Sequence, residues 1–410
     1  MGRTEKKFYL LQIGFGWGWL IGPIYPLFLM SRGLDLFEMA VVMATYFVVV
    51  LACEVPTGAV ADIYGRRVSF VLACVTRMVA FLLYPFADGL IDCMVYEAID
   101  AVGTTLASGS LEAWAIDGMK AEGDERRRDP VFARSNILTR TAMAIGGIGG
   151  AYLADFDIII PWFLAGAGYG ATAAYAAVAM REPRPAEPPR WRGSGRLIAE
   201  TTRAGIREAR DAPVVRLMCI LTVAVGAGTM PVHLQWPPLL LEFTDGGYWA
   251  FGWLAAAMSL GNALGSFLTP RVLAHWSREQ VLAAGHLLRG GGILLAAISG
   301  SLAPALAGLI LTEFAFGAVH PAFQAWINEH IEDRRRATVI SVTQMSFTTG
   351  GAAGLLILGE FARQAGIATS WLACGLIVAA SAPFFLRLGA LSAAAESAQQ
   401  APRTQPDLEA

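Results

Sequence analysis

The stretch Gly58-Ala-Val-Ala-Asp62-Ile-Tyr-Gly65-Arg66-Arg67 decides the fold, because it joins two long apolar runs through a short charged turn. Gly58 and Gly65 allow helices to approach closely and the chain to turn tightly. Asp62 stands where the N-terminus of a helix from another part of the chain can attract its negative charge. The stretch therefore predicts a charged contact between helices, and its alternative interpretation is an ordinary positively charged loop.

The rest of the chain is unusually apolar. Hydrophobic residues make up 55% and charged residues 16% of the 410 positions, whereas soluble proteins are about 25% charged. A helix that crosses a bilayer needs about 20 mostly apolar residues. Twelve such runs occur, at 8–30, 37–60, 68–87, 90–116, 133–154, 157–180, 213–241, 248–275, 280–299, 302–327, 337–361 and 368–388. The sequence therefore predicts an all-α membrane protein with twelve transmembrane helices.

The composition also excludes several classes of protein. The net charge of −2 gives no support for nucleic acid as a partner. The five cysteines have neither CxxC nor metal-ligand spacing, so we expect buried thiols and no metal. We find neither a phosphate-binding loop of the Walker type nor a nucleophile motif. The chain is therefore expected to be no enzyme, to use no cofactor and to draw no energy from ATP.

Lysine and arginine lie almost entirely on alternate loops. Of the 31 basic residues, 26 fall on the side of the two termini, and only Arg32 and Arg363 fall on the other. The remaining three, Arg77, Arg140 and Arg289, lie within apolar runs. Since positive residues collect on the cytoplasmic side, we expect a multi-pass protein of the inner membrane with both termini in the cytoplasm.

The chain also divides into two similar halves. Glu112-Ala-Trp114 ends the fourth apolar run, and Gln324-Ala-Trp326 ends the tenth, with arginine triplets after each. A proline- and arginine-rich segment separates the halves. We therefore expect six-helix bundles at 1–180 and 213–390, a cytoplasmic linker at 181–212, and a disordered tail at 391–410.

Residues 58–67 resemble the cytoplasmic signature G-x-x-x-D-x-x-G-R-[KR] of the major facilitator superfamily. The resemblance extends over the whole chain, and it implies a transporter of two six-helix bundles with alternating access. It further implies a gate in which Asp62 meets the start of span 11 near Ala337, while Arg66 or Arg67 reaches Asp117.

Other stretches match some motifs of the family and depart from others. Glu54-Val-Pro56-Thr57 and residues 108–113 are similar to a bacterial branch rich in drug and metabolite exporters. The second copy of the signature, at 261–271, lacks its acidic residue, so the gate is not expected to be symmetric. In the fourth run, Asp100 stands about where the family usually has an arginine, and the antiporter motif of the fifth run lacks its proline.

Charged residues within the membrane form the next set of candidates, because burying them there is costly. At 1.5 Å per residue, Arg77 and Asp100 both lie about 14–15 Å deep on adjacent spans. We expect a buried ion pair, either static or part of proton coupling.

Glu112, Arg140 and Glu54 are expected at one depth in the inner third of the membrane. Glu112 beside Arg140 could release a proton when the pair separates, or it could be a structural tie. Glu313 lies in mid-span 10, with only Arg289 as a basic partner within a span. It is expected at a solvated cavity position, as a substrate site or a proton-coupling site. His320 is a weaker candidate for a proton site.

Polar and aromatic residues of the cavity-lining spans are candidates for substrate contact, with Trp17 as the expected aromatic wall. The candidates are Trp17, Tyr25, Gln235, Trp236, Asn262, Trp326 and Gln344. Aromatic residues facing inward would suit an apolar, flat or cationic substrate, and the alternative is that they pack or anchor at the membrane interface.

Together these features predict a secondary active transporter, a monomer that moves a small molecule across the bilayer with protons. Export of a hydrophobic compound or drug by antiport is the first hypothesis, which would connect the protein to drug resistance. Proton-coupled uptake of a metabolite is the second. A sensor or scaffold that transports nothing is the alternative from another class, although it would not need an intact gate.

Overall fold

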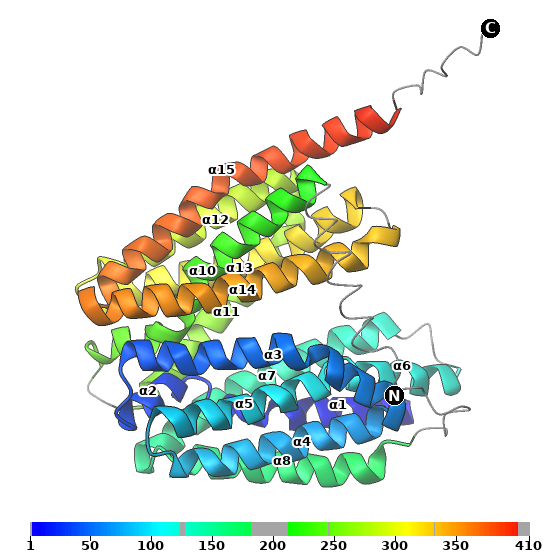
Figure 1. Cartoon of the computed structure of the whole chain (residues 1–410), viewed down its shortest axis with the longest axis vertical. Helices are drawn as coiled ribbons and strands as arrows, with labels where there is room; N and C mark the ends of the chain where they lie inside the picture. Colours follow the sequence, from blue (N-terminus) through cyan, green and yellow to red (C-terminus); the bar gives the residue numbers. More distant parts are fainter. Residues whose placement is uncertain (1, 124–127, 182–211, 245–246, 332, 401–410) are drawn as a thin grey trace, which may run out of the picture.

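The computed structural model describes residues 2–123, 128–181, 212–244, 247–331 and 333–400, which are helical almost throughout. Figure 1 shows two bundles of helices that lie side by side, each formed by one half of the chain. The first bundle contains α1 (Arg3–Phe15), α2 (Tyr25–Ser31), α3 (Leu36–Tyr64), α4 (Arg66–Leu83), α5 (Leu90–Ala107), α6 (Ser110–Ala121), α7 (Arg128–Phe156) and α8 (Ile160–Ala179). The second contains α10 (Pro213–Leu241), α11 (Trp249–Leu273), α12 (Arg278–Ala297), α13 (Leu302–His330), α14 (Asp333–Ala365) and α15 (Ile367–Gln400).

Two of the predicted spans are interrupted helices. Between α1 and α2 the chain passes through the 3₁₀ helix η1 (Gly16–Leu20), and α5 and α6 are separated at Ser108 and Gly109. Gly109 adopts a φ of 69°, which a side chain would disfavour. With these two interruptions, the described helices form twelve segments at the places of the twelve apolar runs. Eight of the segments are long and apolar enough to cross a membrane by length and composition alone.

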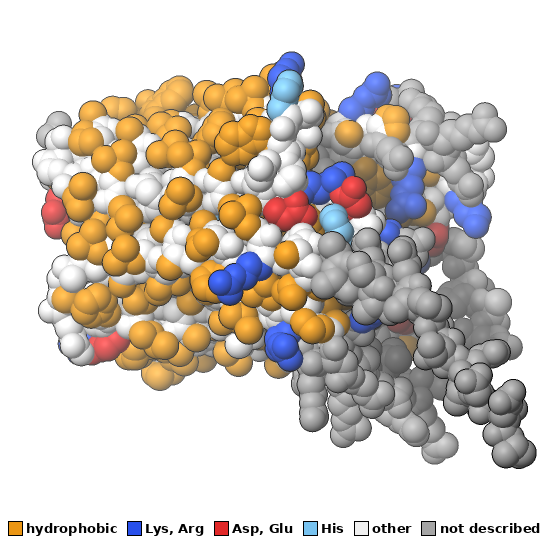
Figure 2. Space-filling view, turned by 90° about the horizontal axis from the view of Figure 1, so that it is seen from above, with side chains coloured by type: hydrophobic (Ala, Val, Ile, Leu, Met, Phe, Trp, Pro, Cys, Tyr) orange, Lys and Arg blue, Asp and Glu red, His pale blue; other side chains and the backbone are white. Residues whose placement is uncertain are grey.

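The outer surface fits a lipid environment. Large apolar side chains such as Phe156, Val178 and Leu260 are more than two-thirds exposed. Figure 2 shows hydrophobic side chains over most of one face, with charged ones gathered toward one end. Each bundle also has its own core, around Trp162 in the first and Trp371 in the second. Apolar residues thus face both inward and outward, as in a bilayer-spanning protein.

The end of the molecule that carries Arg66 and Arg278 is here called the arginine-rich end. The two bundles contact each other near the opposite end. There α3 packs on α14 and α7 packs on α11. A Cβ atom on Gly359 would lie 2.6 Å from the Ala40 Cβ, so small residues permit this approach. The backbone N–H of Tyr248 donates to Asp155 Oδ1 across the same contact at 2.5 Å. Figure 1 shows the bundles diverging toward the arginine-rich end.

The expected start of the C-terminal tail falls within a helix. The helix α15 continues to Gln400, so the chain does not leave helical structure at 391. The segment after 390 reads LSAAAESAQQ, and alanine, leucine and glutamine favour helix. The predicted linker lies outside the described residues, except at its ends, residues 181 and 212.

Candidate functional site

A cavity of about 510 Å³ lies between the two bundles. The first bundle supplies most of its wall, and α10 contributes Met230, His233 and Leu234 from the second. This volume falls within the range of about 300–1,000 Å³ that is usual for small-molecule sites. The cavity is therefore the candidate binding site.

An ion pair forms one side of the cavity. Arg77 of α4 donates from Nε to Asp100 Oδ1 at 2.7 Å and from Nη2 to Oδ2 at 3.1 Å. The two side chains are only 15% and 10% exposed. Gly103, one turn along α5 from Asp100, leaves the room that the Arg77 side chain occupies, since a Cβ there would lie 2.5 Å from Arg77 Cγ. The buried pair predicted from depth in the membrane is thus present.

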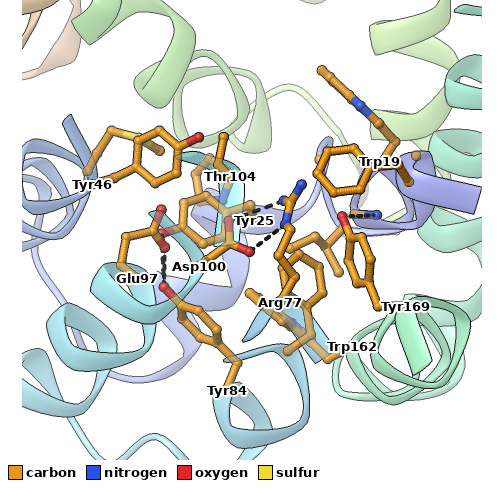
Figure 3. A pocket seen from close by; sticks show the side chains of 18 of the residues that line it. Trp19, Tyr25, Tyr46, Arg77, Tyr84, Glu97, Asp100, Thr104, Trp162 and Tyr169 are labelled. Atoms are coloured by element: carbon orange, nitrogen blue, oxygen red, sulfur yellow. Dashed lines mark hydrogen bonds and ion pairs between the residues drawn. The ribbon is translucent and has the colours of Figure 1, made fainter. Parts of the chain in front are cut away.

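Glu97 is a second acid on this wall, and the sequence interpretation missed it. It precedes Asp100 by three residues on α5, so both lie on one face of the helix. Its Oε2 accepts hydrogen bonds from the Tyr25 hydroxyl, at 2.7 Å, and from the Tyr84 hydroxyl. Figure 3 shows Glu97 and Asp100 beside these tyrosines and Arg77. The signal available in the sequence was the i, i+3 spacing of two acids within one apolar run.

Aromatic rings make up much of the remaining wall. Trp162 of α8 stacks on Tyr84 with ring centroids 4.2 Å apart. Trp19 lines the cavity and is 48% exposed, and Tyr25 lines it as predicted. Trp17, the expected aromatic wall, does not line the cavity; it packs against α8, where a Cβ on Gly168 would lie 2.2 Å from its ring.

A polar cluster from three helices lies on the second bundle's side. Glu313 of α13 contacts His233 of α10, with Oε1 and Nε2 3.1 Å apart. Its Oε2 accepts from Asn262 Nδ2 of α11 at 3.0 Å. His233 lines the central cavity, while Glu313 lines only a small neighbouring void of about 10 Å³. Glu313 is 13% exposed rather than openly solvated, and His233 connects it to the cavity.

Each bundle has an equivalent ion pair at the arginine-rich end. Arg66, at the start of α4, contacts Asp117 near the end of α6, as predicted. Arg278, at the start of α12, contacts Glu329 near the end of α13. Arg278 follows Arg66 in the sequence by the same number of residues as Glu329 follows Asp117. The second half therefore retains this contact, although its copy of the signature lacks the acid.

The same offset relates two buried arginines with unequal partners. Arg289 follows Arg77 by this same number of residues, and Thr312 follows Asp100 by it. The second half therefore has a threonine where the first half has the acid Asp100. Arg289 is 1% exposed, and its Nε and Nη2 make no hydrogen bond within the described residues. These are the two atoms that Arg77 uses to bind Asp100. The acid of the second half, Glu313, is displaced by one position and faces His233 instead.

Thr312→Asp should raise the unfolding temperature of the purified protein. An aspartate there would offer Nε and Nη2 of Arg289 the partner that Asp100 offers Arg77, and hydrogen bonds to charged groups contribute about 1.5–3 kcal/mol. Thr312→Asn, which adds a side chain of the same shape without the charge, is the control. An Asp variant no more stable than the Asn variant would contradict the correspondence between the two halves.

The predicted contact between Glu112 and Arg140 is not formed in the described structure. Glu112 accepts a hydrogen bond from Gln12 Nε2 at 3.1 Å. Arg140 is exposed and lies near enough to His320 of the other bundle for an electrostatic interaction. The reason is that α1 packs against both α6 and α7 and stands between them. Glu54, the third member of the expected group, is exposed.

The residues of the signature lie at the junction of α3 and α4. Gly65 takes a φ of 93° between α3 and α4, which accounts for the need for glycine there. Asp62 is exposed, and it makes no hydrogen bond to any part of the chain that the structure describes. A Cβ on Gly58 would meet nothing within 4 Å, so no helix packs on it in this conformation. The side chain of Ala337, the expected neighbour of Asp62, lies outside the described residues, and Arg67 is exposed.

The other predicted cavity residues lie elsewhere. Gln235 is fully buried, and its Oε1 accepts from Trp371 Nε1 at 3.1 Å. Trp236 lines the small void near Glu313, and Trp326 is buried with its indole N–H on Glu279 at 2.6 Å. Gln344 is exposed and does not line the cavity. Among the described residues, no group of three or more His, Cys, Asp or Glu side chains is placed to hold a metal ion.

Two bundles of apolar helices around a cavity with charged and aromatic walls define a membrane transport protein. The chain belongs to the Major Facilitator Superfamily, whose sequence profile matches residues 9–250 and 236–407. The family expected from residues 58–67 is therefore confirmed, as is the all-α fold.

Similar proteins include transporters of several kinds. The chain is 23% identical to the uncharacterised MFS-type transporter YxaM of Bacillus subtilis (strain 168) over 85% of its length and 86% of the relative. It is also 23% identical to the multidrug efflux pump Tap of Mycolicibacterium fortuitum, over 90% and 91%. Among solved structures, the nucleoside transporter NupG shares the fold with a TM-score of 0.74 and 12% identity, over 95% of this chain and 99% of the other. A bacterial homologue of the lysosomal transporter Spinster, in an inward-facing conformation, has a TM-score of 0.66 and 15% identity, over 98% of each chain.

Proposed function

We propose that the protein is a secondary active transporter that uses the proton gradient to export a hydrophobic small molecule. The observation that carries the proposal is the cavity of about 510 Å³ between the bundles, with aromatic rings beside Arg77, Asp100 and Glu97. Its ionisable side chains can respond to protons, and its rings can bind an apolar body. The similarity to the efflux pump Tap supports export.

Proton-coupled uptake of a metabolite is the second candidate. It is favoured by the polar side chains His233, Asn262 and Glu313 on the second bundle's side, which could bind a substrate rich in hydrogen-bonding groups. Structures of the same fold include nucleoside and peptide transporters. A sensor or scaffold would need neither the cavity nor the signature residues.

We further propose the orientation that follows from the distribution of basic residues. The arginine-rich end faces the cytoplasm, together with both termini and the segment 181–212, in the inner membrane. The bundles contact each other at the opposite end, so the conformation is inward-facing. The protein works as a monomer, since one chain encloses the whole cavity.

Flux measurements in proteoliposomes test the function and its direction. Purified protein is reconstituted, a pH gradient is imposed, and the distribution of labelled candidate compounds is followed over time. Accumulation against the compound's own gradient, driven by protons moving the opposite way, is expected for export. Accumulation with protons moving the same way would favour uptake, and the absence of flux for every compound would favour the scaffold.

Asp62→Asn is expected to slow transport at least about tenfold while leaving substrate binding near that of the wild type. The carboxylate at Asp62 is remote from the cavity, and in the outward-facing state we expect it to meet the positive N-terminus of α14. Gly58 and Gly65 would allow that approach. The comparison is with Asp157→Asn, at the opposite end of the molecule. If Asp62→Asn transported at the wild-type rate at equal protein content, Asp62 would have no role in the gate.

A further inference from the structure

We propose that the central cavity binds a monovalent organic cation with an aromatic body, and that Glu97 recognises the positive charge. This inference rests on the proposed function, since it names the substrate class of the same cavity. It assigns to Glu97 a role in specificity that is separate from proton coupling at Glu313.

The charge balance of the cavity is the first support. The arginine and carboxylic-acid side chains that line the described part of the cavity are Arg77, Asp100 and Glu97. Arg77 and Asp100 neutralise each other through two hydrogen bonds. The partners of Glu97 are two phenol donors, so in its ionised form Glu97 gives the cavity one negative charge. A ligand with one positive charge would balance this negative charge.

The hydrogen bonds of Glu97 leave one oxygen available. Tyr25 and Tyr84 both donate to Oε2, which stabilises the carboxylate and fixes its orientation. Oε1 makes no hydrogen bond with any described residue. Glu97 is 6% exposed and lines the cavity, so a bound cation could reach Oε1 without competing with the tyrosines.

The aromatic rings have unequal availability for a ligand. The guanidinium of Arg77 already lies over Phe15, Phe81 and Tyr169, at 5.0, 5.6 and 4.8 Å from the ring centroids. Trp19 and Tyr46 line the cavity without a cation over their rings in the described structure, and Trp19 is 48% exposed. A cation over an aromatic face gains about 0.5–2 kcal/mol, so these two rings add to the charge selection of Glu97.

Other ligand classes fit the cavity less well. A carboxylate or phosphate would meet Glu97 and Asp100, while Nε and Nη2 of Arg77 are already bonded. A bare metal ion lacks a cluster of three protein ligands in the described residues. The volume of about 510 Å³ accommodates an organic molecule of several rings.

Binding of two nearly isosteric probes to the purified protein tests the inference. The probes are the cation N-methyl-phenylpyridinium and neutral phenylpyridine, measured by equilibrium binding at a pH where the second is uncharged. The wild type is expected to bind the cation at least about tenfold more tightly. Glu97→Gln should lower affinity for the cation about tenfold or more and leave affinity for the neutral probe unchanged. Trp19→Ala should weaken both probes.

Two further variants control the measurement. Glu97→Asp keeps the charge and should retain a preference for the cation, whereas Asp92→Asn, on the same helix but outside the cavity, should bind like the wild type. An unchanged cation affinity in Glu97→Gln, or a wild type that does not prefer the cation, would overturn the inference. The assay needs no transport, so failure of proton-driven flux would reject the proposed function while this result stood by itself.

Discussion

Asp100→Asn is expected to lower the stability of the protein by about 3–5 kcal/mol, far more than a surface substitution would. Removing the carboxylate leaves the Arg77 guanidinium buried and uncompensated, with a side chain that is only 15% exposed. The measurement is the yield of monodisperse protein in detergent and its unfolding temperature.

Two comparisons separate the loss of the charge from other effects. Asp92→Asn lies on the same helix, where Asp92 accepts only from the backbone N–H of Asp88, and should behave like the wild type. The double variant Arg77→Gln with Asp100→Asn removes both charges and should recover much of the loss, because neutral partners need no compensation. A single Asp100→Asn variant as stable as the wild type would show that the pair is dispensable.

Glu313→Gln is expected to abolish transport driven by a pH gradient, with at least about a tenfold loss of accumulation. Glu313 contacts the imidazole of His233, and it joins α10, α11 and α13. A proton on this pair could change the contacts that α10, which lines the cavity, makes with α11 and α13. Glutamine keeps an oxygen that can accept from Asn262 and an amide that can donate to a neutral His233, but it cannot carry a proton. Downhill exchange of substrate should persist, since it moves no net proton.

Glu112→Gln is the matched comparison in the same proteoliposomes. Glu112 accepts a hydrogen bond from Gln12 and makes no ion pair with Arg140. We therefore expect this variant to retain coupling. If Glu112→Gln loses uphill transport while Glu313→Gln keeps it, the proton site belongs to α6 instead.

Depth in the membrane could be predicted from the sequence, but direction around the helix axis could not. The Arg77–Asp100 pair followed from equal depth on neighbouring spans, and the structure contains it. Equal depth also suggested Glu112 with Arg140, yet α1 lies between their helices. Which helices are neighbours, and which face each presents, depends on the packing of the whole bundle.

The aromatic wall illustrates a second limit. Trp17 and Trp19 lie two positions apart in a glycine-rich stretch, and Trp17 was the expected aromatic wall. The chain forms a 3₁₀ helix there, with three residues per turn instead of 3.6, so the direction of each side chain changes. Trp19 lines the cavity as a result. The contact between His233 and Glu313 was likewise not predicted, because it joins residues 80 positions apart.

The unequal arginines indicate a division of labour between the halves. Arg77 holds Asp100 through Nε and Nη2, which ties α4 to α5 in the first bundle's cavity wall. Arg289 keeps two unmet donors in the half that holds Glu313, a penalty of about 1–3 kcal/mol for a buried polar group. Selection for activity often retains such local losses of stability where motion is required. One ancestral plan, present in both halves of the chain, would thus serve as a fixed frame in the first and as the adaptable, mobile element in the second.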